Sequence, residues 1–102
     1  MNSELVKAVL QDELERNRRL LSRYKKEVEN LPKGSIYIRN IGNHQYIYLN
    51  YRDGKKVISK FIGKKENLNI EALQIQLEKR KEYKLLLKKL KQEQKELLKV
   101  LK

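Results

Sequence analysis

The sequence predicts an α+β fold in which two long helices flank a three-stranded antiparallel β-meander, all within a single domain spanning residues 1–102. Two long stretches contain neither glycine nor proline, which indicates uninterrupted helices over residues 3–30 and 69–101. Between them, residues 35–62 alternate β-branched or aromatic side chains with polar ones, as in half-buried strands. The predicted molecule is a helical hairpin or a coiled-coil stalk that carries a β-sheet head.

The first helix is expected to begin with Ser3 as its N-cap and to end before the breaker Leu31-Pro32-Lys33-Gly34. It would be roughly 40 Å long, too long to be covered by a small sheet. Its apolar residues are spaced four and three residues apart, as in a coiled-coil seam. Asn17 occupies one seam position, where a polar residue can fix the register of the paired helices. The predicted helix–helix interface residues are Leu10, Leu14, Leu21, Tyr24 and Val28.

The central region is predicted to form the strands IYIRNI, QYIYLNY and KKVISKFI. Gly42-Asn43 marks the first turn, and Asp53-Gly54 predicts a type I′ turn with positive φ at both central residues. That turn would pair Leu49 with Ile58 and Tyr46 with Phe61. One face would then carry Ile36, Ile38, Ile47, Leu49 and Ile58, and the other Tyr37, Arg39, Tyr46, Tyr48, Asn50, Val57, Ser59 and Phe61.

The second helix is predicted to start at Asn67 or Asn69 as its N-cap. Its apolar residues fall into two stripes separated by the charged block EKRKE. The early stripe, Ile70, Leu73 and Leu77, is expected under the sheet. The later stripe is expected either along the first helix of the same chain or across a homodimer axis. Its interface residues are Leu87, Leu90, Leu97 and Leu101, preceded by Tyr83.

Composition excludes several classes of function. The chain has no cysteine and one histidine, His44, so no disulfide, thiolate metal site or imidazole cluster can form, and no metal or cofactor is expected. Neither a signal peptide nor a run of eighteen apolar residues is present, which predicts a cytoplasmic protein without membrane association. The sequence also lacks a phosphate-binding glycine loop and a Ser/His/Asp set, so we expect no enzyme.

Positive charge is concentrated in the middle of the chain. The formal net charge is +12, and residues 31–65 contain eight basic residues against one acidic residue, Asp53. A segment with so little internal pairing favours an anionic partner.

The candidate contact residues combine this charge with aromatic rings on one sheet face. Bases stack on flat side chains, while Lys and Arg neutralise phosphates. Burial of Tyr46 and Phe61 as core is the alternative for those two rings. The predicted nucleic-acid or partner-binding residues are Tyr37, Arg39, Tyr46, Tyr48, Arg52, Lys55, Lys56, Lys60, Lys64 and Lys65.

Residues 31–64 carry the motifs LPKG, YxYLxYR, GKK and IG, and in these they resemble short proteins of bacterial mobile elements and phages. Three strands followed by a helix are also similar to the arm-binding domain of phage tyrosine recombinases. That similarity implies contact with nucleic acid through the sheet. The stretch IYIRNIGNHQYIY resembles the start of the GIY-YIG nuclease module, but Tyr48 stands where its glycine belongs, and its catalytic arginine and glutamate have no counterpart.

Three functions remain open on the sequence. The leading hypothesis is a phage or mobile-element protein that binds DNA or RNA through its β-hairpin head in the cytoplasm of a bacterial host. The second is an anti-CRISPR-type inhibitor that docks on a nucleoprotein complex such as a CRISPR nuclease. The third is a coiled-coil adaptor for protein interactions.

Overall fold

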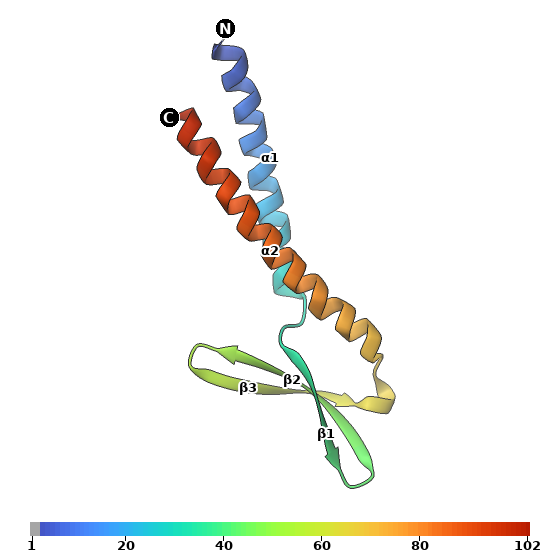
Figure 1. The fold of residues 1–102 in the computed structure, drawn as a ribbon. Helices are drawn as coiled ribbons and strands as arrows, with labels where there is room; N and C mark the ends of the chain where they lie inside the picture. Colours follow the sequence, from blue (N-terminus) through green and yellow to red (C-terminus); the bar gives the residue numbers. More distant parts are fainter. Residues whose placement is uncertain (1–2) are drawn as a thin grey trace. The chain divides into compact units, whose positions relative to one another are not determined.

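The computed structural model describes residues 3–102 and shows the predicted α+β fold (Figure 1). Helix α1 (Ser3–Asn30) is followed by strands β1 (Ser35–Ile41), β2 (His44–Asp53) and β3 (Lys56–Lys64). A short 3₁₀ helix, η1 (Lys65–Asn67), leads to helix α2 (Ile70–Leu101). The strands form one antiparallel sheet in the order β1-β2-β3, so the predicted meander is confirmed.

The chain divides into two compact units. The helical unit comprises residues 3–30 and 81–102, and the sheet unit comprises residues 31–80. The boundary in α2 falls inside the charged block of residues 78–82, where the two apolar stripes were predicted to separate. The early stripe belongs to the sheet unit, in which Leu77 is buried, and the later stripe belongs to the helical unit. That residues 1–102 form a single domain stays a prediction.

Within the helical unit, α1 packs antiparallel against α2 of the same chain. The Asn17 amide nitrogen donates to the Leu90 carbonyl oxygen at 2.8 Å, and the rings of Tyr24 and Tyr83 meet edge to face with centroids 4.9 Å apart. Of the two predicted arrangements, the structure therefore shows the one in which the later stripe of α2 packs against α1 of the same chain. The predicted interface residues are buried (Leu14, Val28, Leu90) or half-buried (Leu10, Leu21, Tyr24, Leu87, Leu97, Leu101).

The heptad spacing explains why α1 uses this face. Residues four and three apart lie on one side of a helix, and here that side is the one removed from water. Asn17 sits in the middle of the seam and is fully buried. Its side-chain nitrogen also donates to the Glu93 carboxylate at 3.1 Å, whereas its oxygen has no hydrogen-bond partner. A buried amide of this kind fixes the pairing register at a cost in stability.

The hairpin between β2 and β3 differs from the predicted one. Asp53 pairs with Lys56, so the loop residues are Gly54 and Lys55 rather than Asp53 and Gly54. Gly54 has φ +63°, and no described non-glycine residue has positive φ. A loop that places glycine alone in the positive-φ position avoids the strain that a type I′ turn would impose on Asp53, and it matches the Gly-X pattern of type II′ turns.

This change shifts the cross-strand partners by two residues. Leu49 faces Lys60 and Tyr48 faces Phe61, so the predicted Leu49–Ile58 and Tyr46–Phe61 pairs are wrong. Since side chains alternate with period two, a shift of two residues leaves every residue on its predicted face. Beyond Phe61, a bulge opposite Ile47 and Tyr48 inserts one extra residue, and β3 continues to Lys64 rather than ending at residue 62.

The LPKG segment enters the sheet at a position that only glycine can occupy. Gly34 has φ +106°, and a Cβ atom placed there would lie 2.5 Å from the carbonyl oxygen of Asn50. The preceding Lys33 places its ammonium group 4.6 Å from the centre of the Tyr51 ring. Close approach of this segment to β2 explains the glycine, and the cation–π contact holds the lysine stem against the sheet.

Asn69 caps α2. Its side-chain oxygen accepts a hydrogen bond from the Ala72 amide at 3.0 Å, which selects Asn69 over the alternative cap Asn67. The helix accordingly starts at Ile70, one residue after the predicted start. We expect Asn69→Ala to lower the free energy of unfolding by about 1 kcal/mol, because an orphan amide at the helix start loses its acceptor. Thermal denaturation followed by circular dichroism measures the loss, with Asn67→Ala as the control; equal losses in both variants would contradict the assignment.

Candidate functional site

One face of the sheet carries aromatic and basic side chains in rows that cross the strands. Directly opposed residues point to the same face, so the pairing register defines these rows. We call this surface the open face. Its rows are Ile41–His44 on β1 and β2 alone, then Arg39–Tyr46–Lys64, then Tyr37–Tyr48–Phe61, then Ser35–Asn50–Ser59, and finally Arg52–Val57 on β2 and β3 alone.

The two faces of the sheet differ sharply in exposure. On the face opposite the open face, Ile47 is 0% exposed and Leu49 is 2% exposed. On the open face, Tyr37 is 51% exposed and Phe61 is 55% exposed. An antiparallel sheet commonly packs one face against the core and exposes the other to solvent, but the side chains of the solvent-exposed face are then mostly polar. An aromatic row in that position is the kind of exposed apolar patch that marks an interaction surface.

The aromatic rings of the open face contact one another. Phe61 meets Tyr48 edge to face with centroids 5.5 Å apart and lies 6.2 Å from the Tyr46 ring. Tyr46 and Tyr48 are half-buried, and Phe61 is exposed. The alternative that Tyr46 and Phe61 form a buried core is therefore wrong. Mutual contact holds the rings in place while their outer surfaces stay accessible.

The predicted basic residues divide between the two faces. Arg39, Arg52 and Lys64 share the open face with the tyrosines. Lys60 faces Leu49 and Lys56 faces Asp53, which places both lysines on the opposite side of the sheet. Lys55 lies in the hairpin turn, and Lys65 begins η1. The structure thus brings together Tyr37, Arg39, Tyr46, Tyr48, Arg52 and Lys64, with Phe61 added, and separates Lys55, Lys56 and Lys60 from them.

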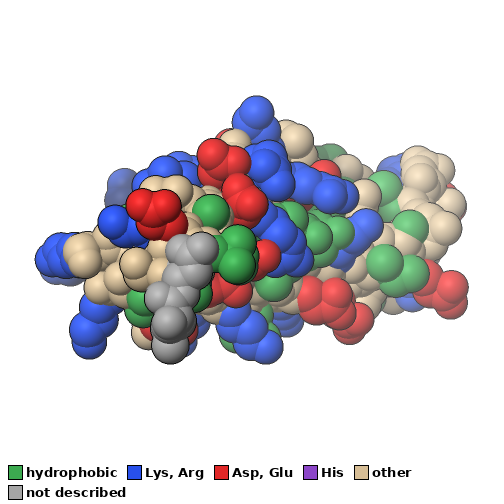
Figure 2. Space-filling model, turned by 90° about the horizontal axis from the view of Figure 1, so that it is seen from above, with side chains coloured by type: hydrophobic (Ala, Val, Ile, Leu, Met, Phe, Trp, Pro, Cys, Tyr) green, Lys and Arg blue, Asp and Glu red, His purple; other side chains and the backbone are tan. Residues whose placement is uncertain are grey.

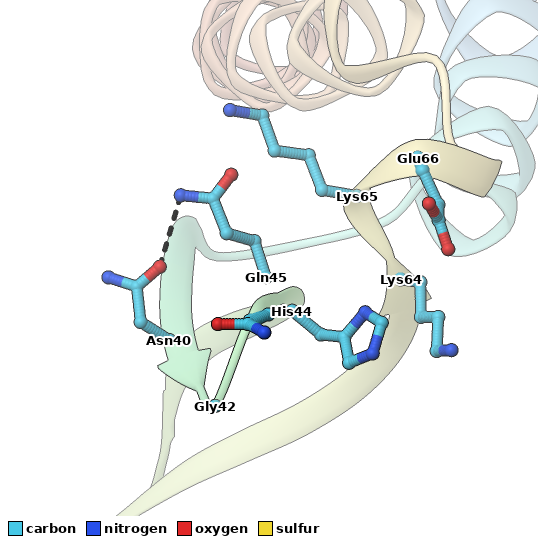
Figure 3. A pocket seen from close by; sticks show the side chains of 8 residues that line it. Asn40, Gly42, His44, Gln45, Lys64, Lys65 and Glu66 are labelled. Atoms are coloured by element: carbon cyan, nitrogen blue, oxygen red, sulfur yellow. Dashed lines mark hydrogen bonds between the residues drawn. The ribbon is translucent and has the colours of Figure 1, made fainter.

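A shallow hollow adjoins the open face at the β1–β2 turn (Figure 3). It is lined by Asn40 and residues 42–45 on one side and by residues 64–66 on the other. The Gln45 side-chain nitrogen donates to the Asn40 side-chain oxygen at 3.0 Å, and the His44 ring lies 6.4 Å from the Tyr46 ring. No binding role was predicted for His44 from the sequence, whereas the structure places it with Lys64 and Lys65 in the lining of this hollow.

The hollow does not resemble a metal site. Among residues 3–102, no group of three or more His, Asp or Glu side chains is placed to hold an ion. Its lining instead combines amide, imidazole and ammonium groups, which can donate hydrogen bonds, with the carboxylate of Glu66, which accepts them. Within the same described part of the chain, no helix is long and apolar enough to cross a membrane.

The helices also carry basic side chains that were not among the predicted binding residues. Residues 1–30 contain nearly equal numbers of basic and acidic residues, so their summed charge suggested no binding surface. Seen from above, the space-filling view shows Lys and Arg side chains across the surface with Asp and Glu groups between them (Figure 2). The positions of the charges along each helix, rather than their sum, are the signal that shows where basic side chains gather on the helices.

Comparison with known proteins identifies a family to which the chain is similar. A family model described as a domain of unknown function, DUF6788, matches residues 10–72, more than half of the chain. The match covers most of α1, the whole sheet and the start of α2. No curated protein and no solved structure gives a significant match. The chain therefore belongs to the DUF6788 family.

Proposed function

We propose that this chain binds nucleic acid through the open face of its sheet. The observation that carries the proposal is the exposed aromatic row Tyr37–Tyr48–Phe61. The basic row Arg39–Tyr46–Lys64 lies next to it on one side, and on the other side Arg52 lies beyond the polar row Ser35–Asn50–Ser59. From Tyr46 to Arg52 the strand advances by six residues, about 20 Å, which is long enough for several nucleotides. Basic groups at both ends would neutralise phosphates, and the rings between them would accept stacked bases.

The face suits splayed or unpaired bases more than an intact duplex. A side chain stacks on a base only when the base is unstacked from its neighbours, as in single strands, loops and bulges. The Asn50 side chain lies in the next row, bonded to the Ser59 hydroxyl at 2.6 Å, and its amide nitrogen is available to a base edge or phosphate. The resemblance of residues 31–64 to mobile-element proteins supports a bacterial setting, and the similarity to the arm-binding domain of phage recombinases supports contact with nucleic acid through the sheet.

The proposal is tested by fluorescence anisotropy of the chain with labelled single-stranded DNA, structured RNA and duplex DNA at several salt concentrations. We expect binding in which log K falls linearly with log salt, because basic residues displace condensed counterions. Substitution of Phe61 by Ala should weaken binding to the preferred polymer by about 5- to 30-fold, the loss of roughly one stacked base. Leu substitution at Tyr51, on the opposite face, is the matched control.

Absence of salt-dependent binding to all three polymers would contradict the proposal. An inhibitor of a CRISPR nuclease complex would then bind the assembled nucleoprotein and not free nucleic acid. An adaptor would bind a protein partner with an affinity that does not depend on the open-face cations. Binding to a purified nuclease complex, measured with the same labelled chain, separates these two outcomes.

A further inference from the structure

The helical unit carries a dense band of positive charge in the C-terminal half of α1 and in the adjoining stretch of α2. Between residues 16 and 26, α1 has six basic residues and no acidic one. Between residues 81 and 91, α2 has five basic residues and a single acidic one, Glu82. All eleven basic residues are exposed. We call them the helical belt: Arg16, Arg18, Arg19, Arg23, Lys25, Lys26, Lys81, Lys84, Lys88, Lys89 and Lys91.

Antiparallel pairing brings the two basic stretches side by side. The hydrogen bond from Asn17 to Leu90 joins them near one end, and the ring contact of Tyr24 with Tyr83 joins them near the other. The two stretches are more than fifty residues apart in the sequence, so their charges add only in the folded chain. The register fixed by the buried Asn17 is thus also the register that assembles the helical belt.

Acidic residues flank the α1 half of the helical belt but do not interrupt it. Arg16 lies 3.8 Å from Glu13, and the Arg23 guanidinium lies 5.5 Å from the centre of the Tyr24 ring. The remaining acidic residues of α1 lie at Glu4 and residues 12–15, and at residues 27–29, outside the band. Residues 16–26 contain no interleaved acid, and the acids at i,i+4 spacing from Arg16, Arg19, Arg23 and Lys25 lie outside this stretch, at residues 12, 15, 27 and 29.

Positions beside the seam carry cations on both helices. Arg18 and Lys25 follow the seam residues Asn17 and Tyr24, and Lys84 and Lys91 follow Tyr83 and Leu90. Paired helices usually place opposite charges at such flanking positions, because these form interhelical salt bridges. Like charges there oppose the pairing, and an external anion would relieve the repulsion.

The outer surface of α1 forms a hollow among these side chains. It is lined by Arg18, Arg19, Ser22, Arg23, Lys26 and Glu27. Arg19, Arg23 and Lys26 are spaced by four and three, on the side of α1 opposite the seam. Guanidinium groups bind phosphate oxygens in bidentate fashion, and the Ser22 hydroxyl can donate to the same group.

We propose that the helical belt is a second binding surface, for the phosphate backbone of duplex nucleic acid. Each basic stretch spans eleven residues, about 16 Å of helix, over which the two stretches together present eleven cations. That is roughly one cation per 1.5 Å of helix, close to the charge density of a duplex, which has about one phosphate per 1.7 Å of its axis. A single strand has half that charge density, about one phosphate per 3.4 Å. The inference rests on the proposed function and extends it: the sheet takes unpaired bases, and the helical belt takes a neighbouring double-stranded segment.

The test compares two variants of the full chain that each lose four positive charges from the helical unit. The belt variant changes Arg18, Arg19, Lys84 and Lys88 to Gln, and the control changes Lys7, Lys95, Lys99 and Lys102 to Gln. All eight side chains are exposed. The probe is a labelled hairpin with a duplex stem and a single-stranded tail, made as DNA and as RNA to distinguish the two sources of phosphate. Circular dichroism melting confirms that both variants stay folded.

We expect the belt variant to bind the hairpin about 100-fold more weakly at low salt, with the slope of log K against log salt reduced by three to four. The control should change the slope by less than one. A wild-type slope in the belt variant would overturn the inference, as would equal losses in the two variants. Loss of binding to vesicles containing phosphatidylserine with unchanged hairpin binding would overturn it in favour of an acidic lipid surface.

A parallel titration separates this inference from the proposed function. The single-stranded tail alone should bind wild type and belt variant equally, because the open face is intact in both. If the tail alone fails to bind and the duplex stem still depends on the helical belt, the open face is overturned and the helical belt stands. If the tail binds and the stem adds nothing, the reverse holds.

Discussion

Replacing Arg39, Arg52 and Lys64 with Gln should weaken binding of single-stranded nucleic acid by about 100-fold at low salt and reduce the salt slope by about two. These three side chains share the open face with the aromatic row. Arg39 and Arg52 are exposed and Lys64 is half-buried. The loss is expected because, in the proposed complex, each group would neutralise a phosphate beside a base that stacks on Tyr37, Tyr48 or Phe61.

The matched control replaces Lys55, Lys56 and Lys60 with Gln. It removes the same charge from the same sheet, but these lysines lie in the turn and on the opposite side. We expect a loss of less than about fivefold, from the reduced net charge alone. Equal losses in the two triple variants would show that the hairpin attracts nucleic acid only through its total charge, and the open face would lose its role.

Replacing Asn17 with Asp should lower the free energy of unfolding by about 3–5 kcal/mol at neutral pH. Asn17 is fully buried, and its amide nitrogen lies 2.8 Å from the Leu90 carbonyl oxygen and 3.1 Å from a Glu93 carboxylate oxygen. A carboxylate in its place would bring negative charge against two acceptors with no donor to compensate. Thermal and urea denaturation of the variant and the wild type measure the difference.

The destabilisation should depend on pH in a defined direction. Burial beside two acceptors raises the pKa of the new carboxyl in the folded chain above its unfolded value of about 4. A group with a raised folded pKa contributes stability that is fully present below the unfolded pKa and is lost as pH rises through the folded pKa. The variant should therefore approach wild-type stability near pH 3, where its protonated carboxyl donates to Leu90, and lose it progressively above that.

Gln11→Glu is the control for this prediction. It makes the same amide-to-carboxyl change on an exposed side of α1, so its stability should stay within about 0.5 kcal/mol of wild type at every pH. A deficit of the Asn17 variant that does not vary with pH would contradict the account. It would indicate that the seam tolerates the charge by opening to water.

The helices and their seam could be predicted closely because the relevant signals are local. Heptad spacing placed Leu14, Asn17 and Val28 on the buried side of α1, and the absence of glycine and proline set the helix lengths. The choice between a partner within the chain and a second copy could not be made, since both bury the same stripe. Contacts such as that of Asn17 with Leu90 join residues far apart in sequence and decide the question only in the folded chain.

The faces of the sheet were predicted correctly although the hairpin register was not. Alternation with period two assigns faces, whereas register depends on which residues form the turn. Asp53-Gly54 and Gly54-Lys55 both suit a two-residue loop by sequence, and the conformational cost at Asp53 distinguishes them. The error affected the candidate site through Phe61, which packs against Tyr48 in the row that carries the proposed function.

The helical belt was not predicted from the sequence because the charge was summed over long segments of the chain. Acidic residues near both ends of α1 cancel the basic residues between them in such a sum, although they lie at least a turn away from the middle of the band. The second half of the helical belt lies on α2, and its proximity depends on the antiparallel register. Net charge in a sliding window would have identified each half, but not their assembly.

The most direct test of the open-face account is an NMR titration of aromatic ring protons with the preferred single-stranded oligonucleotide. Stacked bases shift neighbouring ring signals, and Tyr51 is an internal reference because it lies on the opposite face beside Lys33. The account predicts saturable shifts of the Tyr37 and Phe61 rings, with Tyr51 unchanged. Shifts at Tyr51 without shifts at Tyr37 and Phe61, or saturated binding that leaves all three rings unchanged, would contradict it.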